Sequence, residues 1–152
     1  MTLKGTEAME ESVVISVEGT QKIIGEEKQT VQIVTDGTMR REGDVVYLSY
    51  EESEMTGMEG TTTTFAVGKD NVILTRTGAI QSRMVFEKGK KNVGLYDLGF
   101  GALTIGVKAR RMNSTLGPDG GRLEISYGIE IEETVQGLNS FIIDVRKPSV
   151  VN

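Results

Sequence analysis

Two charged residues, Arg76 and Glu52, stand at positions where the sequence alternates between apolar and polar side chains. Arg76 follows Leu74 at the second position, and Glu52 follows Tyr50 in the same way. Because successive side chains of a strand point to opposite faces, both charges are predicted to point inward. An inward charge is costly unless it is paired or close to water, so we expect both to lie near the mouth of the structure, where they could pair. They either anchor a ligand carboxylate or phosphate, or sit at strand ends and reach solvent along their own stems.

Several large side chains are candidates for the wall of a binding cavity near these charges: Tyr50, Met84, Phe86, Tyr96 and Tyr127. An aromatic ring with a polar tip can line a pocket, although a core Tyr with a bonded hydroxyl is commoner. Met84 and Phe86 could form the floor of a cavity. They could equally be core residues, because small barrels are often filled by their own side chains.

The residue types that most catalytic sites need are missing. The chain has no Cys and no His, which excludes thiolate nucleophiles, Cys/His zinc sites and His-based triads. Adjacent residues of a strand point to opposite faces, so no pair of neighbouring carboxylates could flank a glycosidic bond by itself: Glu10-Glu11, Glu26-Glu27, Glu51-Glu52 and Glu132-Glu133. Carboxylates from different strands remain open as a pair. No Asp-x-Asp-x-Asp-Gly calcium loop is present. We therefore predict a protein that is not an enzyme and carries no cofactor or metal.

The elements that must position these residues are β-strands. Val, Ile and Thr far outnumber Leu and Ala, and β-branched side chains suit a pleated surface. Apolar residues also recur at every second position, most clearly between Arg122 and Glu132. The pattern predicts strands at residues 12–19, 30–36, 45–52, 61–67, 72–76, 82–87, 93–98, 103–111, 122–132 and 140–146.

Turn residues separate these segments, among them Asp36-Gly37, Glu42-Gly43-Asp44, Lys88-Gly89-Lys90 and Gln136-Gly137. No long segment with a 3.6-residue period could supply crossover helices, so a parallel α/β sheet is disfavoured. An antiparallel barrel and a two-layer sandwich both remain possible. We favour an all-β, up-and-down barrel of about eight to ten strands, because closure removes exposed strand edges.

Length and charge bound the remaining possibilities. The chain has 152 residues, enough for one domain, and a formal net charge of −5, which argues against nucleic-acid binding. No apolar run resembles a signal peptide or a membrane helix, and the absence of Cys fits a reducing compartment, so we expect a cytoplasmic protein without a membrane association. We predict a flexible N-terminal segment at residues 1–11, a barrel domain at 12–147 and a C-terminal tail at 148–152.

An ordered set of short segments resembles the bacterial YwiB-like proteins, a family of unknown function assigned to the calycin-like β-barrels. The segments are residues 43–52 (GDVVYLSYEE), 60–63 (GTTT), 72–78 (VILTRTG), 83–86 (RMVF) with Gly89, Tyr96 with Gly101, 120–123 (GGRL) with Ser126-Tyr127, and 137–139 (GLN). The resemblance implies a lipocalin-like, calycin-like barrel and no established activity. The chain lacks the N-terminal Gly-x-Trp of the lipocalins, and Asp97-Leu98 replaces the Thr and Pro expected after Tyr96.

The leading functional hypothesis is a binder of a small, partly apolar molecule inside the barrel or at its mouth. Tyr50, Met84, Phe86, Tyr96 and Tyr127 would line the site, and Arg76 and Glu52 would be its polar anchors. The alternative is a barrel filled by its own side chains that acts as a protein-interaction or assembly module through its outer surface or the loop at residues 53–59. We expect the two methionines of this loop, Met55 and Met58, to be exposed. A connected interior void above about 300 Å³ would favour the binder.

Overall fold

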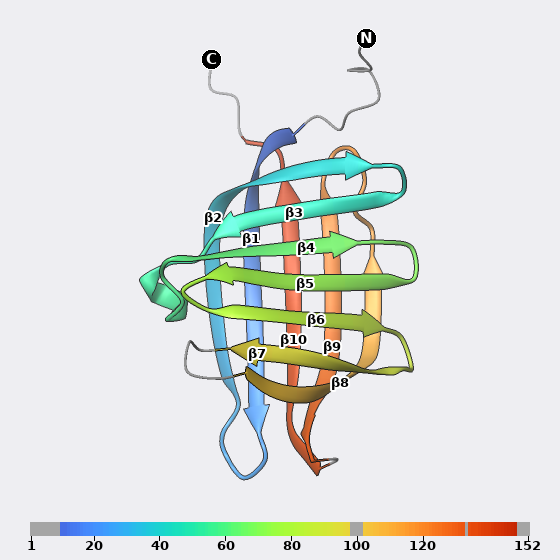
Figure 1. The fold of residues 1–152 in the computed structure, drawn as a ribbon. Helices are drawn as coiled ribbons and strands as arrows, with labels where there is room; N and C mark the ends of the chain where they lie inside the picture. The colour runs from blue at the N-terminus through green and yellow to red at the C-terminus, as the bar shows by residue number, and fades with distance from the viewer. Residues whose placement is uncertain (1–9, 98–101, 133, 149–152) are drawn as a thin grey trace.

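The computed structural model describes residues 10–97, 102–132 and 134–148, and over these residues the chain forms a closed antiparallel β-barrel (Figure 1). Ten strands follow one another around the barrel in chain order, and β1 closes it by pairing with β10. The prediction of an all-β, up-and-down barrel is therefore confirmed, and the sandwich is excluded. Within these described ranges, no helix is long and apolar enough to cross a membrane.

All ten predicted segments form strands, and several strands are longer than the pattern predicted. The elements are β1 (Glu10–Ile23), β2 (Gln29–Glu42), β3 (Val45–Glu51), the 3-10 helix η2 (Glu54–Thr56), β4 (Thr61–Val67), β5 (Asn71–Gly78), β6 (Gln81–Glu87), β7 (Lys91–Asp97), β8 (Ala102–Ser114), β9 (Gly121–Ile131) and β10 (Thr134–Arg146). β1 begins two residues before the predicted domain boundary at residue 12. Leu98, the predicted last residue of the seventh strand, lies outside the described residues.

Two sets of strands cross each other to enclose the interior. The short strands β3–β7 run across one side of the barrel, and β1, β9 and β10 run along its length behind them (Figure 1). β2 and β8 bend and pass from one set to the other (Figure 1). The ladder between β8 and β9 has an irregularity between Ala109 and Arg111, where the extra residue bends the strand.

Gly37 lies inside β2, where this strand bends. The turn that the sequence predicted at Asp36-Gly37 is therefore wrong. The residue pairs with Val13 on β1 and with Tyr50 on β3, so it lies inside a strand with partners on both sides. A Cβ at this position would lie 2.6 Å from the backbone oxygen of Ser49, and it would also contact the Ile15 side chain. Glycine is therefore required for the close approach of the strands.

The predicted turn at Gln136-Gly137 is also wrong, because this segment is an irregularity inside β10. The pairing between β10 and β9 shifts by one residue between Val135 and Gly137, which leaves Gln136 without a direct partner on β9. The Gln136 carbonyl instead accepts a hydrogen bond from the Ile24 amide at 3.0 Å. A glycine within a strand is therefore equally compatible with a bulge and with a turn.

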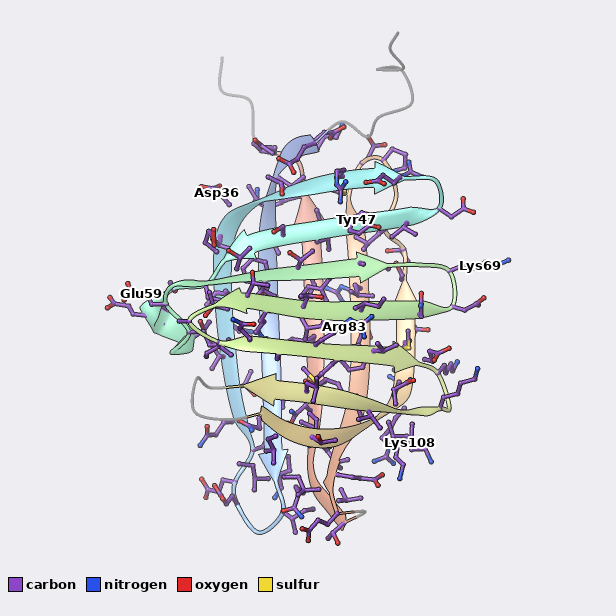
Figure 2. All side chains as sticks on the ribbon, in the orientation of Figure 1. Asp36, Tyr47, Glu59, Lys69, Arg83 and Lys108 are labelled. Atoms are coloured by element: carbon purple, nitrogen blue, oxygen red, sulfur yellow. The ribbon has the colours of Figure 1, made fainter. Side chains whose placement is uncertain are left out.

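The core lies toward the end of the barrel that holds the first residues of β1 and the last residues of β10, where Val13, Ile15, Ile143 and Val145 are buried. Its fully buried side chains come from both sets of strands: Val13, Ile15, Leu48, Phe65, Leu74, Phe86, Leu123, Ile125 and Ile143. The polar residues of the alternating pattern point to the outer surface of the barrel. Figure 2 shows this surface with the labelled side chains of Asp36, Arg83 and Lys108. On the same outer surface, the Arg40 guanidinium lies 4.3 Å from the centre of the Tyr47 ring.

Candidate functional site

A cavity of about 530 Å³ occupies the interior at the end of the barrel away from this core. Inward-facing residues from eight strands and from the loop after β3 line it. The apolar part of the wall includes Ile33, Ile80, Met84, Ile105, Ile129 and Phe141. The polar part includes Glu52, Arg76 and Asn139. The interior is therefore packed with side chains at one end and hollow at the other.

Four buried polar side chains form a continuous row beside this cavity, and we call them the polar row: Tyr50, Thr63, Arg76 and Ser82. Tyr50 and Arg76 line the cavity, and Thr63 and Ser82 lie next to them across the strands. Tyr50 pairs with Thr63 across β3 and β4, Thr63 pairs with Arg76 across β4 and β5, and Arg76 pairs with Ser82 across β5 and β6. Directly paired residues share one face of a sheet, and all four are buried. The register of four consecutive strands thus brings together residues far apart in the sequence.

Glu52 lies beside the polar row, and its carboxylate accepts hydrogen bonds from three hydroxyl groups. Thr63 Oγ1 donates to Oε2 at 2.5 Å, and Thr56 Oγ1 donates to Oε1 at 2.9 Å. The Tyr50 hydroxyl also hydrogen-bonds to the carboxylate. Hydrogen bonds to a charged group are stronger than neutral ones, and they compensate for the burial of Glu52.

The Arg76 guanidinium forms the positive side of the same cluster. Its Nε lies 4.0 Å from Glu52 Oε2, a distance that gives an ion pair without a hydrogen bond. Arg76 is only 7% exposed, and its Nε has no hydrogen-bond partner among the described residues. Both inward charges therefore lie where the alternation predicted them, they form the expected pair, and neither reaches bulk solvent along its stem.

The environment of Tyr50 keeps its hydroxyl protonated. Burial raises the pKa of Tyr50 far above its usual value, and the negative charge of Glu52 raises the pKa further, while Arg76 lowers it. The phenol therefore stays protonated over the whole ordinary pH range. A permanent O–H donor keeps one lone pair of the Glu52 carboxylate occupied.

The loop after β3 closes one side of the cavity, and we call residues 53–59 the flap. Ser53 caps the 3-10 helix η2 by accepting from the Met55 amide, and Gly57 ends it with a φ of 76°. Thr56, Gly57 and Met58 line the cavity, and the Thr56 hydroxyl ties the flap to Glu52. We expected both flap methionines to be exposed, but Met58 is half-buried against the cavity and only Met55, 72% exposed, faces solvent.

The structure brings together most of the residues that the sequence analysis named. Tyr50, Glu52, Arg76, Met84 and Tyr127 line the cavity. Phe86 does not line it, because its fully buried ring packs behind Tyr127, with ring centres 4.7 Å apart. The backbone of Tyr96 belongs to β7, and its side chain lies outside the described part of the structure.

Sequence reasoning missed two groups of residues in the site. Thr63 and Ser82 complete the polar row, and they are recognisable only when the pairing register of β4, β5 and β6 is known. Ile33, Ile129 and Phe141 belong to strands that were predicted, but nothing in the alternation separates a core position from a cavity wall. Among the described residues, no three side chains of the His, Cys, Asp and Glu types are placed to hold a metal ion together.

The fold and the cavity define a class of protein, the closed antiparallel β-barrels with an open interior at one end. The family model described as "Domain of unknown function (DUF1934)" matches residues 15–143, so the chain belongs to this family. It is similar to the uncharacterized β-barrel protein YwiB of Bacillus subtilis (strain 168), with 26% identity over 116 residues, 76% of this chain and 80% of that protein.

A crystal structure of the ywiB protein from Bacillus subtilis has the same fold. It superimposes with a TM-score of 0.83 at 20% sequence identity and covers 97% of this chain and 100% of the other. The resemblance to YwiB-like proteins predicted from the sequence is therefore confirmed, and so is the β-barrel. The calycin-like assignment remains a prediction.

Proposed function

We propose that this protein binds a small, partly apolar molecule in the cavity at the open end of the barrel. The observation that carries the proposal is the buried Arg76 side chain, which lines the cavity and whose Nε has no hydrogen-bond partner among the described residues. A buried donor without a partner is costly, and a bound molecule that accepts its hydrogen bond would remove that cost. The cluster around Arg76 would then orient one end of the ligand.

The size and lining of the cavity support the same proposal. Its volume of about 530 Å³ falls within the range of about 300–1,000 Å³ that is usual for small-molecule sites. Most of the wall is aliphatic or aromatic, and the polar groups lie in a few defined places. Such a wall favours a ligand with an apolar body and one polar end.

We further propose that the site binds its ligand without transforming it, in the cytoplasm. Glu52 is the only carboxylate among the residues that line the described cavity, and its oxygens are held by three hydroxyl donors beside Arg76. A general base needs a lone pair that is free to take a proton from the substrate. The arrangement favours recognition over proton transfer.

The test uses Nile red, an uncharged apolar dye whose fluorescence rises in a dry environment, and two substitutions at consecutive positions of β2. Ile33 faces the cavity, whereas Val34 is 67% exposed on the outer surface. We expect the wild-type protein and Val34→Trp to bind the dye. We expect Ile33→Trp to bind it at least about tenfold more weakly because the indole projects into the cavity and obstructs part of it. Equal binding by the two variants would place the dye elsewhere and overturn the proposal.

A further inference from the structure

The hydrogen bonds around Arg76 and Glu52 leave one polar group without a partner, to which the polar end of a ligand could bind. Both oxygens of Glu52 already accept hydrogen bonds, from Thr56 and Thr63, and Tyr50 donates to the same carboxylate. Arg76 Nε, in contrast, donates to no described atom. Ser82 Oγ is also buried without a described partner, but Ser82 does not line the cavity. The unused capacity on this part of the cavity wall is therefore that of the Arg76 donor, which requires an acceptor on the ligand.

The charge of the cluster restricts which acceptor can enter. Arg76 and Glu52 compensate each other at 4.0 Å, so the buried cluster is neutral as it stands. A ligand carboxylate or phosphate would leave one buried negative charge without compensation, next to Glu52. A cationic ligand would add a second buried positive charge beside the Arg76 guanidinium. An uncharged acceptor, such as a carbonyl oxygen, takes the hydrogen bond without either cost.

A second buried polar atom without a partner lines the cavity from the other set of strands. Asn139, on β10, contributes to the cavity wall, and its Oδ1 is buried without a hydrogen-bond partner among the described residues. β10 runs behind β5, the strand of Arg76, so the two residues belong to facing walls (Figure 1). A ligand N–H or O–H group could donate to Asn139 while a carbonyl accepts from Arg76.

The geometry points to an uncharged ligand in which an apolar chain ends in an amide or a similar group with both a carbonyl oxygen and a hydrogen-bond donor. This inference rests on the proposed function, because it names the chemical class of the molecule that the cavity takes. It also replaces the expectation from the sequence that Arg76 anchors a ligand carboxylate or phosphate. The sequence indicated that Arg76 and Glu52 could pair, and the structure shows that the pair is buried and that its two charges compensate each other.

The test compares three probes with the same hydrocarbon chain and different ends: decanamide, decanoate and decylammonium, titrated calorimetrically into the wild-type protein. We expect decanamide to bind at least about tenfold more tightly than either ion. If decanoate or decylammonium binds as tightly as decanamide, the inference that the ligand is uncharged is overturned, while the proposal that the cavity binds a small molecule is not. If none of the three binds, the proposed function is overturned together with this inference.

Removing the compensating charge should reverse the preference. In Glu52→Gln the Arg76 charge has no partner, so we expect decanoate to gain at least about tenfold relative to decanamide. An unchanged ratio in a folded Glu52→Gln variant would contradict the inference. The uncharged double variant Glu52→Gln/Arg76→Gln is the control, since decanoate should gain nothing there, and it also serves where the single variant fails to fold. A gain of decanoate in the double variant would overturn the charge argument.

Discussion

The two ends of the barrel are made from the same strands, and they differ in the side chains that those strands place in the interior. Toward the packed end, β1 places Val13 and Ile15 inward and β10 places Ile143 and Val145 inward, and all four are buried. Toward the open end, the same two strands place Gly19, Gln21 and Asn139 along the cavity. Small and polar side chains leave space and hydrogen-bonding capacity where branched apolar side chains fill the interior.

This comparison shows that strand formation and core formation are separate properties of the sequence. Backbone pairing of β1 with β10 continues over both ends, from Val14–Arg146 to Ile23–Gly137. Closure of the barrel therefore does not depend on a filled interior at the open end. The packed end carries the stability of the fold, and the open end is free to carry a binding site.

The largest difference between the ends is expected for two isoleucines on the same face of β9. Ile125 is fully buried in the packed end, and Ile129 lies half-buried along the cavity. We expect Ile125→Ala to lower the free energy of unfolding by about 2–5 kcal/mol, because it leaves a cavity in a packed core. Ile129→Ala should cost about 1 kcal/mol, because little new buried space is created. Urea denaturation measures both, and equal losses would remove the distinction between the ends.

The next largest effect concerns the charged pair at the open end. Arg76→Met leaves the buried Glu52 carboxylate without compensation, so we expect a loss of about 3 kcal/mol in the free energy of unfolding. Arg76→Met combined with Glu52→Gln removes both charges and should recover most of that loss. The same denaturation experiment provides the double-mutant cycle. Additive losses from the two substitutions would show that the pair does not interact.

Two glycines provide a smaller contrast between the ends. A Cβ at Gly37 would lie 2.6 Å from the Ser49 carbonyl oxygen, whereas a Cβ at Gly19 would meet only the Phe141 ring, at 3.8 Å. We expect Gly37→Ala to destabilise the protein by about 1–3 kcal/mol through overpacking. Gly19→Ala should change the free energy of unfolding by less than about 1 kcal/mol in either direction. Thermal unfolding monitored by circular dichroism measures both, and a tolerant Gly37 would show that the bend of β2 does not need glycine.

The smallest effect is a pH dependence that originates at Tyr50. Its pKa is raised in the folded protein, mainly by burial, so the unfolded chain loses this proton first as the pH rises. Stability from Tyr50 is therefore complete below about pH 10 and declines above it, by at most about 1.4 kcal/mol per pH unit. Tyr50→Phe should remove this part of the alkaline slope in urea denaturation. Tyr47→Phe, on the outer face, should retain it, and identical slopes in the two variants would contradict the assignment.

The strands could be predicted from the sequence, and their bends could not. Alternation of Val and Ile placed all ten strands, but Gly37 and Gln136-Gly137 resembled turns because glycine permits a turn, a bend and a bulge alike. Alternation also placed Glu52 and Arg76 inward. It could not place Thr63 and Ser82 beside them, since that depends on the register between neighbouring strands.

The cavity itself was only weakly visible in the sequence. Tyr127 and Phe86 occupy equivalent inward positions of their strands, yet one lines the cavity and the other lies behind it. The feature of the sequence that could have indicated the cavity is the change, along single strands, from branched apolar residues to Gly19, Gln21 and Asn139. That signal becomes meaningful once the closure of the barrel shows which ends of these strands meet.

The most direct measurement is a methyl NMR titration of the wild-type protein, labelled at isoleucine, with decanamide. We predict that the methyl resonances of Ile33, Ile105 and Ile129 shift with added ligand, and that those of Ile15, Ile125 and Ile143 stay unchanged. Shifts confined to isoleucines outside the cavity, or no shifts at all, would contradict the account of the open end as a binding site.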